Sequence, residues 1–317
     1  MAKKKKSKKT LKKINYGWIW KVASILFVLL AVVLLYALQP VSKRQEMKRL
    51  GAVCFHDNAS VGLSDIVSDI WTLCFGRGLV PCDLQPEPLP VYGGIPSSQS
   101  PLNILRNDAY WVGYSEEKRT PLWAAYRLFD SPPAVSTIER AESFLPDFRT
   151  SARITSDFYT NSGYDRGHLA SNYSIAKCFG DVAQKQTFLM SNVVPQRHAL
   201  NAGIWKSLEK KEIDTYAPRC QTIWVIAGPI YPSVAVRTIP SGLPIPEAFF
   251  KIILDDVDGR LRAMAFIFPH DMEKGVALKS CLVSIDEIEQ RTGLDFFPEL
   301  PKDVQTALES PVSTKIW

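Results

Sequence analysis

The most regular hydrophobic pattern in the chain is an uninterrupted apolar run near its N-terminus. Residues 22–38 carry no charge, and their only polar side chains are Ser24 and Tyr36. A helix needs about 20 apolar residues, with a range of roughly 17–25, to cross a bilayer. With its Trp-rich flank, the run predicts a transmembrane helix over residues 17–38. Because eight lysines in residues 1–13 precede it, we expect the N-terminus to stay in the cytoplasm and the rest to cross.

Two other interpretations of this apolar run stay open. A cleavable signal peptide has an apolar region of roughly 7–15 residues followed by a small-x-small site, whereas residues 36–39 read Tyr-Ala-Leu-Gln. A mitochondrial transit peptide is typically rich in Arg and Ser. We therefore favour an uncleaved signal anchor, with the folded domain in the bacterial periplasm or at the cell surface, and at the mitochondrial inner membrane as the second choice.

Beyond residue 101 the apolar positions group into short, strand-like runs. Residues 109–115 and 121–129 flank a charged turn at 116–120, which predicts a hairpin rich in aromatic residues. Further buried strands are predicted at residues 222–227, 249–255 and 263–269. The first of these is expected to end at Gly228-Pro229. Residues 187–192 are strand-like as well.

Helical spacing is found in fewer segments. Residues 201–213 predict a helix on which Asn201, Trp205 and Glu209 lie four apart, so they share one face with a drift of about 40° per step. Ser284 with an acid three residues on forms a capping box at the start of a second, short helix. Strands outnumber helices and no regular βαβ alternation appears, which favours an α+β fold class.

The segment between the apolar run and residue 102 is rich in proline over its second half. Residues 81–101 also contain two adjacent glycines, which predicts an extended linker or surface arm. Residues 44–50 could be a helix or a linker, and residues 65–74 a short amphipathic helix. The chain is then divided into a Lys-rich tail (1–16), a transmembrane anchor (17–38), a linker with an N-terminal appendage (39–101) and a compact domain (102–310).

The formal net charge of +6 overstates the basic character of the folded part. Without the eight lysines of residues 1–13, the 38 Lys and Arg residues fall to 30, against 32 Asp and Glu. The domain is therefore not a generally basic nucleic-acid binder, and any such contact must come from a local groove.

Six cysteines are present: Cys54, Cys74, Cys82, Cys178, Cys220 and Cys281. None forms a Cys-x-x-Cys pair, which disfavours a structural zinc site. An even number suits disulfides in an oxidising compartment, and six buried free thiols are the alternative.

The most suggestive polar motif is the string Asp165, Arg166, Gly167 and His168. Histidine can act as a base near neutral pH, since its unperturbed pKa is about 6.5. Arginine suits phosphate, and glycine lets a bulky anion approach the backbone. These are the groups needed to cleave a phosphodiester, although a four-residue string by itself is weak evidence.

Six blocks of sequence, in order, resemble the DNA/RNA non-specific endonuclease family, which includes endonuclease G and the secreted bacterial sugar-non-specific nucleases. The blocks are residues 163–169, 190–196, 200–209, 227–231, 246–251 and 292–297. The resemblance implies a ββα-metal (His-Me finger) nuclease fold with a central, mostly antiparallel sheet. In that fold a β-hairpin carries the histidine and a crossing helix carries the metal ligand.

The resemblance also implies a role for each matching residue. His168 falls on the general base, and Asn201 on the ligand of Mg²⁺, for which Mn²⁺ is a substitute. Glu209 falls on an acid near the metal-bound water, and Arg166 on the arginine of the motif. Asn192 falls on the asparagine of a Ser-Asn-x-x-Pro-Gln block, where we expect it to contact substrate or, more often, to position its neighbours.

Simpler interpretations exist for several of these residues. Asn201 could cap its helix, Glu209 could be a solvated surface residue, and Arg166 could form an ion pair with Asp165. We instead favour Asn201 as a metal ligand and Glu209 as a neighbour of the metal-bound water. Arg166 is favoured as a phosphate contact. Arg119, in the hairpin turn, could reach phosphate or be a plain surface charge.

Four other side chains are given no catalytic role. Trp205 is predicted to lie in the core, and His198 and His270 at the surface. His56 lies outside the matching blocks.

These expectations combine into one hypothesis: a membrane-anchored, Mg²⁺-dependent endonuclease that hydrolyses DNA and RNA with little sequence specificity, because its contacts go mainly to phosphates. The catalytic residues would be His168, Arg166 and Glu209, and the substrate contacts Arg166, Arg119 and Asn192. The alternatives are a catalytically silent, membrane-tethered nucleic-acid-binding module and a phosphodiesterase acting on smaller substrates. A homodimer stays open as a further partnership.

Overall fold

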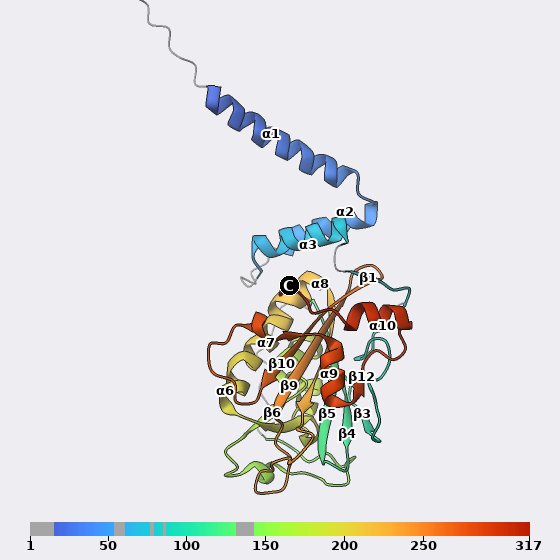
Figure 1. Cartoon of the computed structure of the whole chain (residues 1–317), viewed down its shortest axis with the longest axis vertical. Coiled ribbons are helices and arrows are strands. Elements are labelled where there is room, and N and C mark those ends of the chain that lie inside the picture. Colours follow the sequence, from blue (N-terminus) through green and yellow to red (C-terminus); the bar gives the residue numbers. More distant parts are fainter. Residues whose placement is uncertain (1–15, 54–60, 77–78, 85–86, 131–142) are drawn as a thin grey trace, which may run out of the picture. The chain divides into compact units, whose positions relative to one another are not determined.

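The structure is a computed structural model that describes residues 16–53, 61–76, 79–84, 87–130 and 143–317 (Figure 1). Cys54, His56 and nearly all of the predicted lysine tail lie outside these ranges. The chain divides into two compact units, Met1–Gly51 and Ala52–Trp317. Each unit is described by itself.

The N-terminal unit is built on one long apolar helix, α1 (Tyr16–Ala37). Its 22 residues rise about 1.5 Å each, which gives a length of about 33 Å, close to the roughly 30 Å of a bilayer's hydrocarbon core. Trp20–Ala37 has a mean hydropathy of 2.3, and none of it is buried. By length and composition α1 could cross a membrane, although a signal sequence has the same properties. Pro40 separates it from α2 (Val41–Val53), so the polar segment that follows is a helix.

The larger unit is organised around an eight-stranded sheet in the order β1-β10-β9-β8-β5-β4-β3, with β11 paired to β10. Every pairing in it is antiparallel. Its strands are β1 (Val80–Pro81), β3 (Asn103–Arg106), β4 (Tyr110–Ser115), β5 (Thr120–Phe129), β8 (Thr222–Ile230), β9 (Ala248–Asp256), β10 (Arg260–Pro269) and β11 (Leu282–Val283). The predicted α+β class and antiparallel sheet are confirmed, as is the β4–β5 hairpin.

Strand β8 is longer than predicted, because it continues through Gly228-Pro229 to Ile230. Its pairing with β5 ends at Ala227, whereas its pairing with β9 continues to the end of the strand. Proline removes a ladder donor and is tolerated where one side of a strand is unpaired. Pro229 lies in that part of β8, so the dipeptide does not end the strand.

Both faces of the sheet are covered, each by its own hydrophobic core, and a third, smaller core includes Ile154 and Met190. Neighbouring residues of a strand point to opposite faces, so Tyr126 belongs to one core and Trp123 to the other. The first core includes Trp205, from the helical run at residues 198–220. The second includes Ile288 from α9 (Ile285–Thr292), together with side chains of α10 (Lys302–Glu309). The two groups of helices lie on either side of the strands in Figure 1.

The helical run that was predicted over 201–213 is longer and less regular. It consists of α6 (His198–Leu200), η3 (Asn201–Trp205), α7 (Lys206–Lys211), η4 (Glu212–Tyr216) and α8 (Ala217–Cys220), of which η3 and η4 are π-helical. Gly203 has φ −98° and ψ −118°, which kinks the run. A π segment and the kink interrupt the predicted regular spacing between Asn201 and Trp205, because both change the helical phase. Trp205 and Glu209 remain close enough for their side chains to interact.

The remaining elements are short. They are α3 (Leu63–Phe75), β2 (Ser97–Ser98), η1 (Ser156–Tyr159), β6 (Asp165–His168), α4 (Asn172–Phe179), α5 (Asp181–Gln186), η2 (Met190–Asn192), β7 (Val193–Gln196), η5 (Leu278–Cys281) and β12 (Leu294–Asp295). Ser284 is confirmed as the N-cap of α9, since its hydroxyl accepts from the backbone N–H of Glu287 at 3.1 Å. The strand expected at residues 187–192 begins only at Val193.

The proline-rich segment at 81–101 is extended but is not a surface arm throughout. Val91 and Tyr92 are buried in the second core, and the Tyr92 hydroxyl donates to Asp256 at 2.9 Å. Further along, β2 pairs with β12. Two apolar residues among prolines are too short a signal to predict this packing.

The five cysteines of the described residues are free thiols: Cys74, Cys82, Cys178, Cys220 and Cys281. Burial raises the pKa of Cys178 to about 11, which keeps that thiol protonated and unreactive at neutral pH. For these five residues the free-thiol interpretation holds.

Candidate functional site

The Asp165–His168 motif forms strand β6, which pairs with β7 in a small two-stranded sheet. His168 lies opposite Val193, and Asp165 opposite Gln196. A side chain on Gly167 would overlap the buried side chain of Gln196. The motif therefore needs glycine for the close approach of β7, in addition to any role toward substrate.

Strand alternation separates the motif into two faces. Arg166 and His168 are two residues apart and share a face, and both contact the ring of Phe144, at 5.9 Å from the guanidinium carbon and 5.1 Å between ring centroids. The His168 ring also meets Phe188 edge-on at 5.1 Å. The predicted base, His168, and the predicted phosphate contact, Arg166, thus lie next to each other against the ring of Phe144.

Arg166 is held by groups other than Asp165. Its guanidinium donates to the carbonyl of Ser156 at 2.9 Å and lies over the ring of Tyr159 at 5.8 Å. In the part of the chain that the structure describes, no ion pair joins Arg166 to Asp165, so the simpler interpretation of this arginine does not hold.

Asp165 instead links the motif to the helical run. Its Oδ2 accepts a hydrogen bond from Nδ2 of Asn201 at 2.9 Å and lies 2.9 Å from Nδ1 of His198. Asn201 has helical dihedral angles and follows α6 directly, so it is not an N-cap. Because its amide nitrogen is engaged by a carboxylate, its Oδ1 is the atom left to bind a cation. A neutral oxygen suits Mg²⁺, which keeps several waters and needs few protein ligands.

Glu209 is not a solvated helix residue. Burial raises its pKa to about 7, and the nearby Lys251 opposes this shift. Its Oε1 is buried without a hydrogen-bond partner among the described residues. Such a carboxyl group can hold or release a proton near neutral pH, as a positioning group near a metal-bound water would.

Asn192 has no exposed surface and uses its side chain to clamp backbone. Its Oδ1 accepts from the N–H of Ala170 at 2.8 Å, and its Nδ2 donates to the carbonyls of Ala170 and Thr187 at 3.1 and 3.0 Å. Direct contact with substrate does not fit this burial, whereas positioning of the segment after His168 does.

Arg119 lies at the β4–β5 turn with a left-handed φ of 54°. Its guanidinium donates to the carbonyl of Gly242 at 2.7 Å. The contact joins the hairpin to the loop before β9, and among the described residues no hydrogen bond or ion pair joins Arg119 to the motif.

The similarity of this chain to known proteins agrees with this arrangement. The profile of the family described as DNA/RNA non-specific endonuclease matches residues 93–303, more than half of the 317 residues. The chain belongs to the DNA/RNA non-specific endonuclease family.

Two bacterial nucleases and a human one illustrate the range of relatives. The nuclease of Nostoc sp. PCC 7120 is 30% identical over 235 residues, which cover 69% of this chain and 82% of that protein. The Serratia marcescens nuclease is 31% identical over 215 residues, covering 66% and 75%. Human mitochondrial endonuclease G is 29% identical over 214 residues, covering 62% and 70%.

A solved structure shares the fold as well. A chain of the EndoG/EndoGI complex aligns with a TM-score of 0.58 at 23% identity, over 63% of this chain and 87% of that one. The predicted ββα-metal fold is confirmed. Family membership makes this endonuclease a nucleic-acid hydrolase, and it implies DNA or RNA as substrate and dependence on a divalent metal ion.

Two histidines of the endonuclease outside the motif differ in environment. His198 is exposed, as predicted, with 79% of its side chain accessible. The surface prediction for His270 is wrong: Nε2 accepts from the N–H of Arg197 at 2.8 Å, and Nδ1 donates to the carbonyl of Pro246 at 2.7 Å. Burial lowers its pKa. A lone histidine after an apolar strand carries no sequence signal of such pairing.

One buried polar group of the endonuclease was not predicted from the sequence. Lys251 and Glu212 have no exposed surface, and their charged atoms lie 2.8 Å apart. The ammonium also lies 4.2 Å from the ring centroid of Trp205, and the Tyr126 hydroxyl donates to Glu212 at 2.8 Å. A lysine inside an apolar strand pattern was the available signal, because a buried lysine needs a partner.

Proposed function

We propose that the chain is a membrane-anchored, Mg²⁺-dependent endonuclease that cleaves phosphodiester bonds of DNA and RNA with little sequence specificity. The observation that carries the proposal is the hydrogen bond between Asp165 and Asn201, because it ties the His168 strand to the helix of the proposed metal ligand. It occurs in a chain whose family membership is established from residues 93 to 303.

In this proposal each side chain has a distinct task. His168 takes a proton from water as general base, and Arg166 beside it binds a phosphate oxygen. Asn201 would hold Mg²⁺ through Oδ1, and the ion would neutralise charge on the phosphate and the leaving oxygen. Glu209, with its raised pKa, would hold a proton or orient a water for this site. Arg119 is proposed as a more distant phosphate contact.

Sequence-independent cleavage follows from contacts of this kind. Arginine and a metal ion recognise phosphate, which every nucleotide carries, so they provide no base discrimination. The folded domain lacks an overall basic charge, hence binding would be local to the surface around Arg166.

The apolar helix α1 supports the membrane part of the proposal. Its length matches a bilayer and its positively charged flank favours a cytoplasmic N-terminus. The endonuclease domain would then act outside the cytoplasm, in a bacterial periplasm or at a cell surface. The mitochondrial relatives make the mitochondrial inner membrane the second choice.

The test uses the full-length protein in detergent micelles with supercoiled plasmid and single-stranded RNA. Wild type should nick both substrates in Mg²⁺, lose the activity in EDTA and regain it on addition of excess Mg²⁺. His168→Ala should lower the cleavage rate by about a hundredfold or more while it still binds DNA. Arg291→Ala, which removes a surface arginine paired with Glu247, is the control and should cleave normally.

Three outcomes would contradict the proposal. Unchanged cleavage by His168→Ala would remove the proposed base. DNA binding without cleavage by wild type would support a silent binding module, and cleavage of small diesters alone would support a phosphodiesterase.

A further inference from the structure

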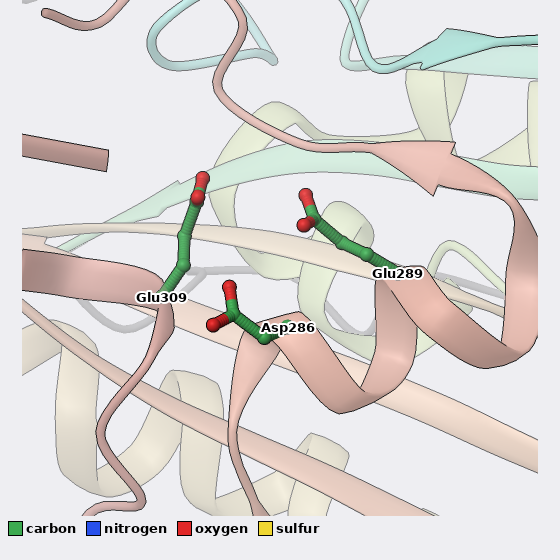
Figure 2. A group of neighbouring side chains, drawn as sticks. All are labelled: Asp286, Glu289 and Glu309. Atoms are coloured by element: carbon green, nitrogen blue, oxygen red, sulfur yellow. The ribbon is translucent and has the colours of Figure 1, made fainter. Parts of the chain in front are cut away.

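Three carboxyl groups converge far from β6 in sequence, between the last two helices. Asp286 and Glu289 lie three residues apart on one face of α9, and Glu309 is the last residue of α10. One oxygen from each group lies within 4.8 Å of the others. Figure 2 shows the three side chains directed toward a shared space. We name Asp286, Glu289 and Glu309 the α9–α10 acid cluster.

The cluster contains a buried carboxyl group without a partner. Glu309 is only 3% exposed, and its Oε1 has no hydrogen-bond partner among the described residues. Burial and the charge of Glu289 raise the pKa of Glu309 to about 8, and burial raises that of Glu289. An unpaired buried carboxylate is costly, so it neutralises or acquires a cation.

The charged groups nearby do not supply that cation. Among the groups that shift the pKa of Glu309 most, Lys302 is basic, and its ammonium donates to Gln305 at 2.9 Å. Asp295 adds a further negative charge. The local balance is therefore negative, with Asp286 at the exposed side where an ion and its waters could enter.

We propose that the α9–α10 acid cluster binds a structural Ca²⁺ ion, separate from the proposed catalytic metal. Carboxylate oxygens are the ligands that hard divalent cations prefer. Mg²⁺ is usually held by one or two carboxylates and keeps several waters, whereas Ca²⁺ accepts six to eight oxygens in a flexible shell. Three carboxyl groups, of which Asp286 is exposed, suit this larger shell, which water would complete.

The ion would cross-link elements that are separate in the sequence. Glu289 Oε1 already accepts from the N–H of Phe296 at 2.7 Å, just after β12, which pairs with β2. An ion shared with Glu309 would thus connect α9, α10 and the segment around β2. Its effect is expected on stability, independent of cleavage.

The test is calcium binding to the EDTA-stripped full-length protein in detergent micelles, by calorimetry and thermal unfolding. Wild type should bind one more Ca²⁺ than Glu309→Gln, and Asp286→Asn should bind at this site about tenfold more weakly or worse. Ca²⁺ should raise the unfolding temperature of wild type more than Mg²⁺ does. The matched controls are Asp303→Asn on α10 and Glu287→Gln on α9, both exposed acids outside the cluster, and both should behave as wild type.

Equal Ca²⁺ stoichiometry and affinity in wild type and Asp286→Asn would overturn the proposal, and this exposed position avoids reliance on a variant that fails to fold. A cluster that only shares protons predicts a different pattern. Then Glu309→Gln would be at least as stable as wild type in Ca²⁺ as well as in EDTA. The proposal requires wild type to gain stability from Ca²⁺ that Glu309→Gln does not gain.

Discussion

Single side chains hold the proposed site in place through the backbone around it. Asn192 is a clear case, because its amide satisfies three backbone groups beside His168. Asp165 instead links β6 to the helical run through a hydrogen bond that it accepts from the side-chain amide of Asn201. The positions of His168 and Asn201 therefore depend on Asn192 and Asp165, side chains that need not contact the substrate.

Asn192→Ala is expected to lower the free energy of unfolding by about 2–4 kcal/mol, because it leaves buried backbone groups unpaired. Urea unfolding measures the change. Asn172→Ala is the control: Asn172 is half-buried with one hydrogen bond, of 3.3 Å to Thr187, and should lose about 1 kcal/mol or less. Unchanged stability with a raised KM for DNA would instead indicate direct substrate contact.

His270 predicts a pH-dependent stability. Its pKa in the folded state is lowered below 6.5, so the unfolded chain takes up a proton first as the pH falls. The stabilisation is present above about pH 6.5 and is lost below it, toward the lower pKa of the folded state. Urea unfolding at pH 7.5 and 5.5 should show this loss as a difference of up to about 1 kcal/mol between wild type and His270→Gln. The raised pKa values of Glu209 and Glu309 act in the opposite direction, but they do so in both proteins.

The control for this prediction compares two histidines. His270→Gln should remove that part of the pH dependence, and His198→Gln, at an exposed position, should keep it. A slope that survives in His270→Gln would assign it to another group.

At the element scale, the helical run over 198–220 is shaped by what lies beneath it. The kink at Gly203 and the π segments η3 and η4 allow Asn201 to face Asp165 while Trp205 packs in the core. Regular helical periodicity does not place both residues in this way. The Lys251–Glu212 pair then joins η4 to the central strand β9.

Lys251→Met should lower the free energy of unfolding by about 3–5 kcal/mol, because it leaves Glu212 buried and unpaired. The double variant Lys251→Met with Glu212→Gln should recover much of this loss, since neither charge remains. Chemical denaturation of the single and double variants measures the coupling. Additive losses in the double variant would show that the pair does not interact.

At the scale of the whole molecule, one apolar helix precedes a domain with its own hydrophobic cores. The domain has the antiparallel sheet of its family, and α1 has the length of a bilayer span. The anchor and the proposed nuclease are therefore separable by sequence.

Full-length protein expressed in cells should remain in the membrane pellet after alkaline carbonate extraction, because a spanning helix is not released by loss of charge contacts. A chain that lacks residues 1–38 should be soluble under the same conditions. A shorter product, beginning after residue 38, in the soluble fraction of cells that express full-length protein would identify α1 as a cleaved signal sequence.

The sequence by itself determined the features that depend on local order. The apolar run of α1, the β4–β5 hairpin and the Ser284 cap each follow from residues that are neighbours in the chain. The ordered blocks around His168 and Asn201 likewise identified the family, because they are contiguous and keep their order.

Only the tertiary structure decided which distant segments meet. His270 is buried against the backbone of Arg197 and Pro246, and Lys251 is buried against Glu212. These partners are distant in the sequence, so no local pattern predicts either pairing. The same holds for the α9–α10 acid cluster. The pKa of a buried side chain depends on the exclusion of solvent and on the charges that folding brings near it. Both are defined only when the sheet and its helices have packed together.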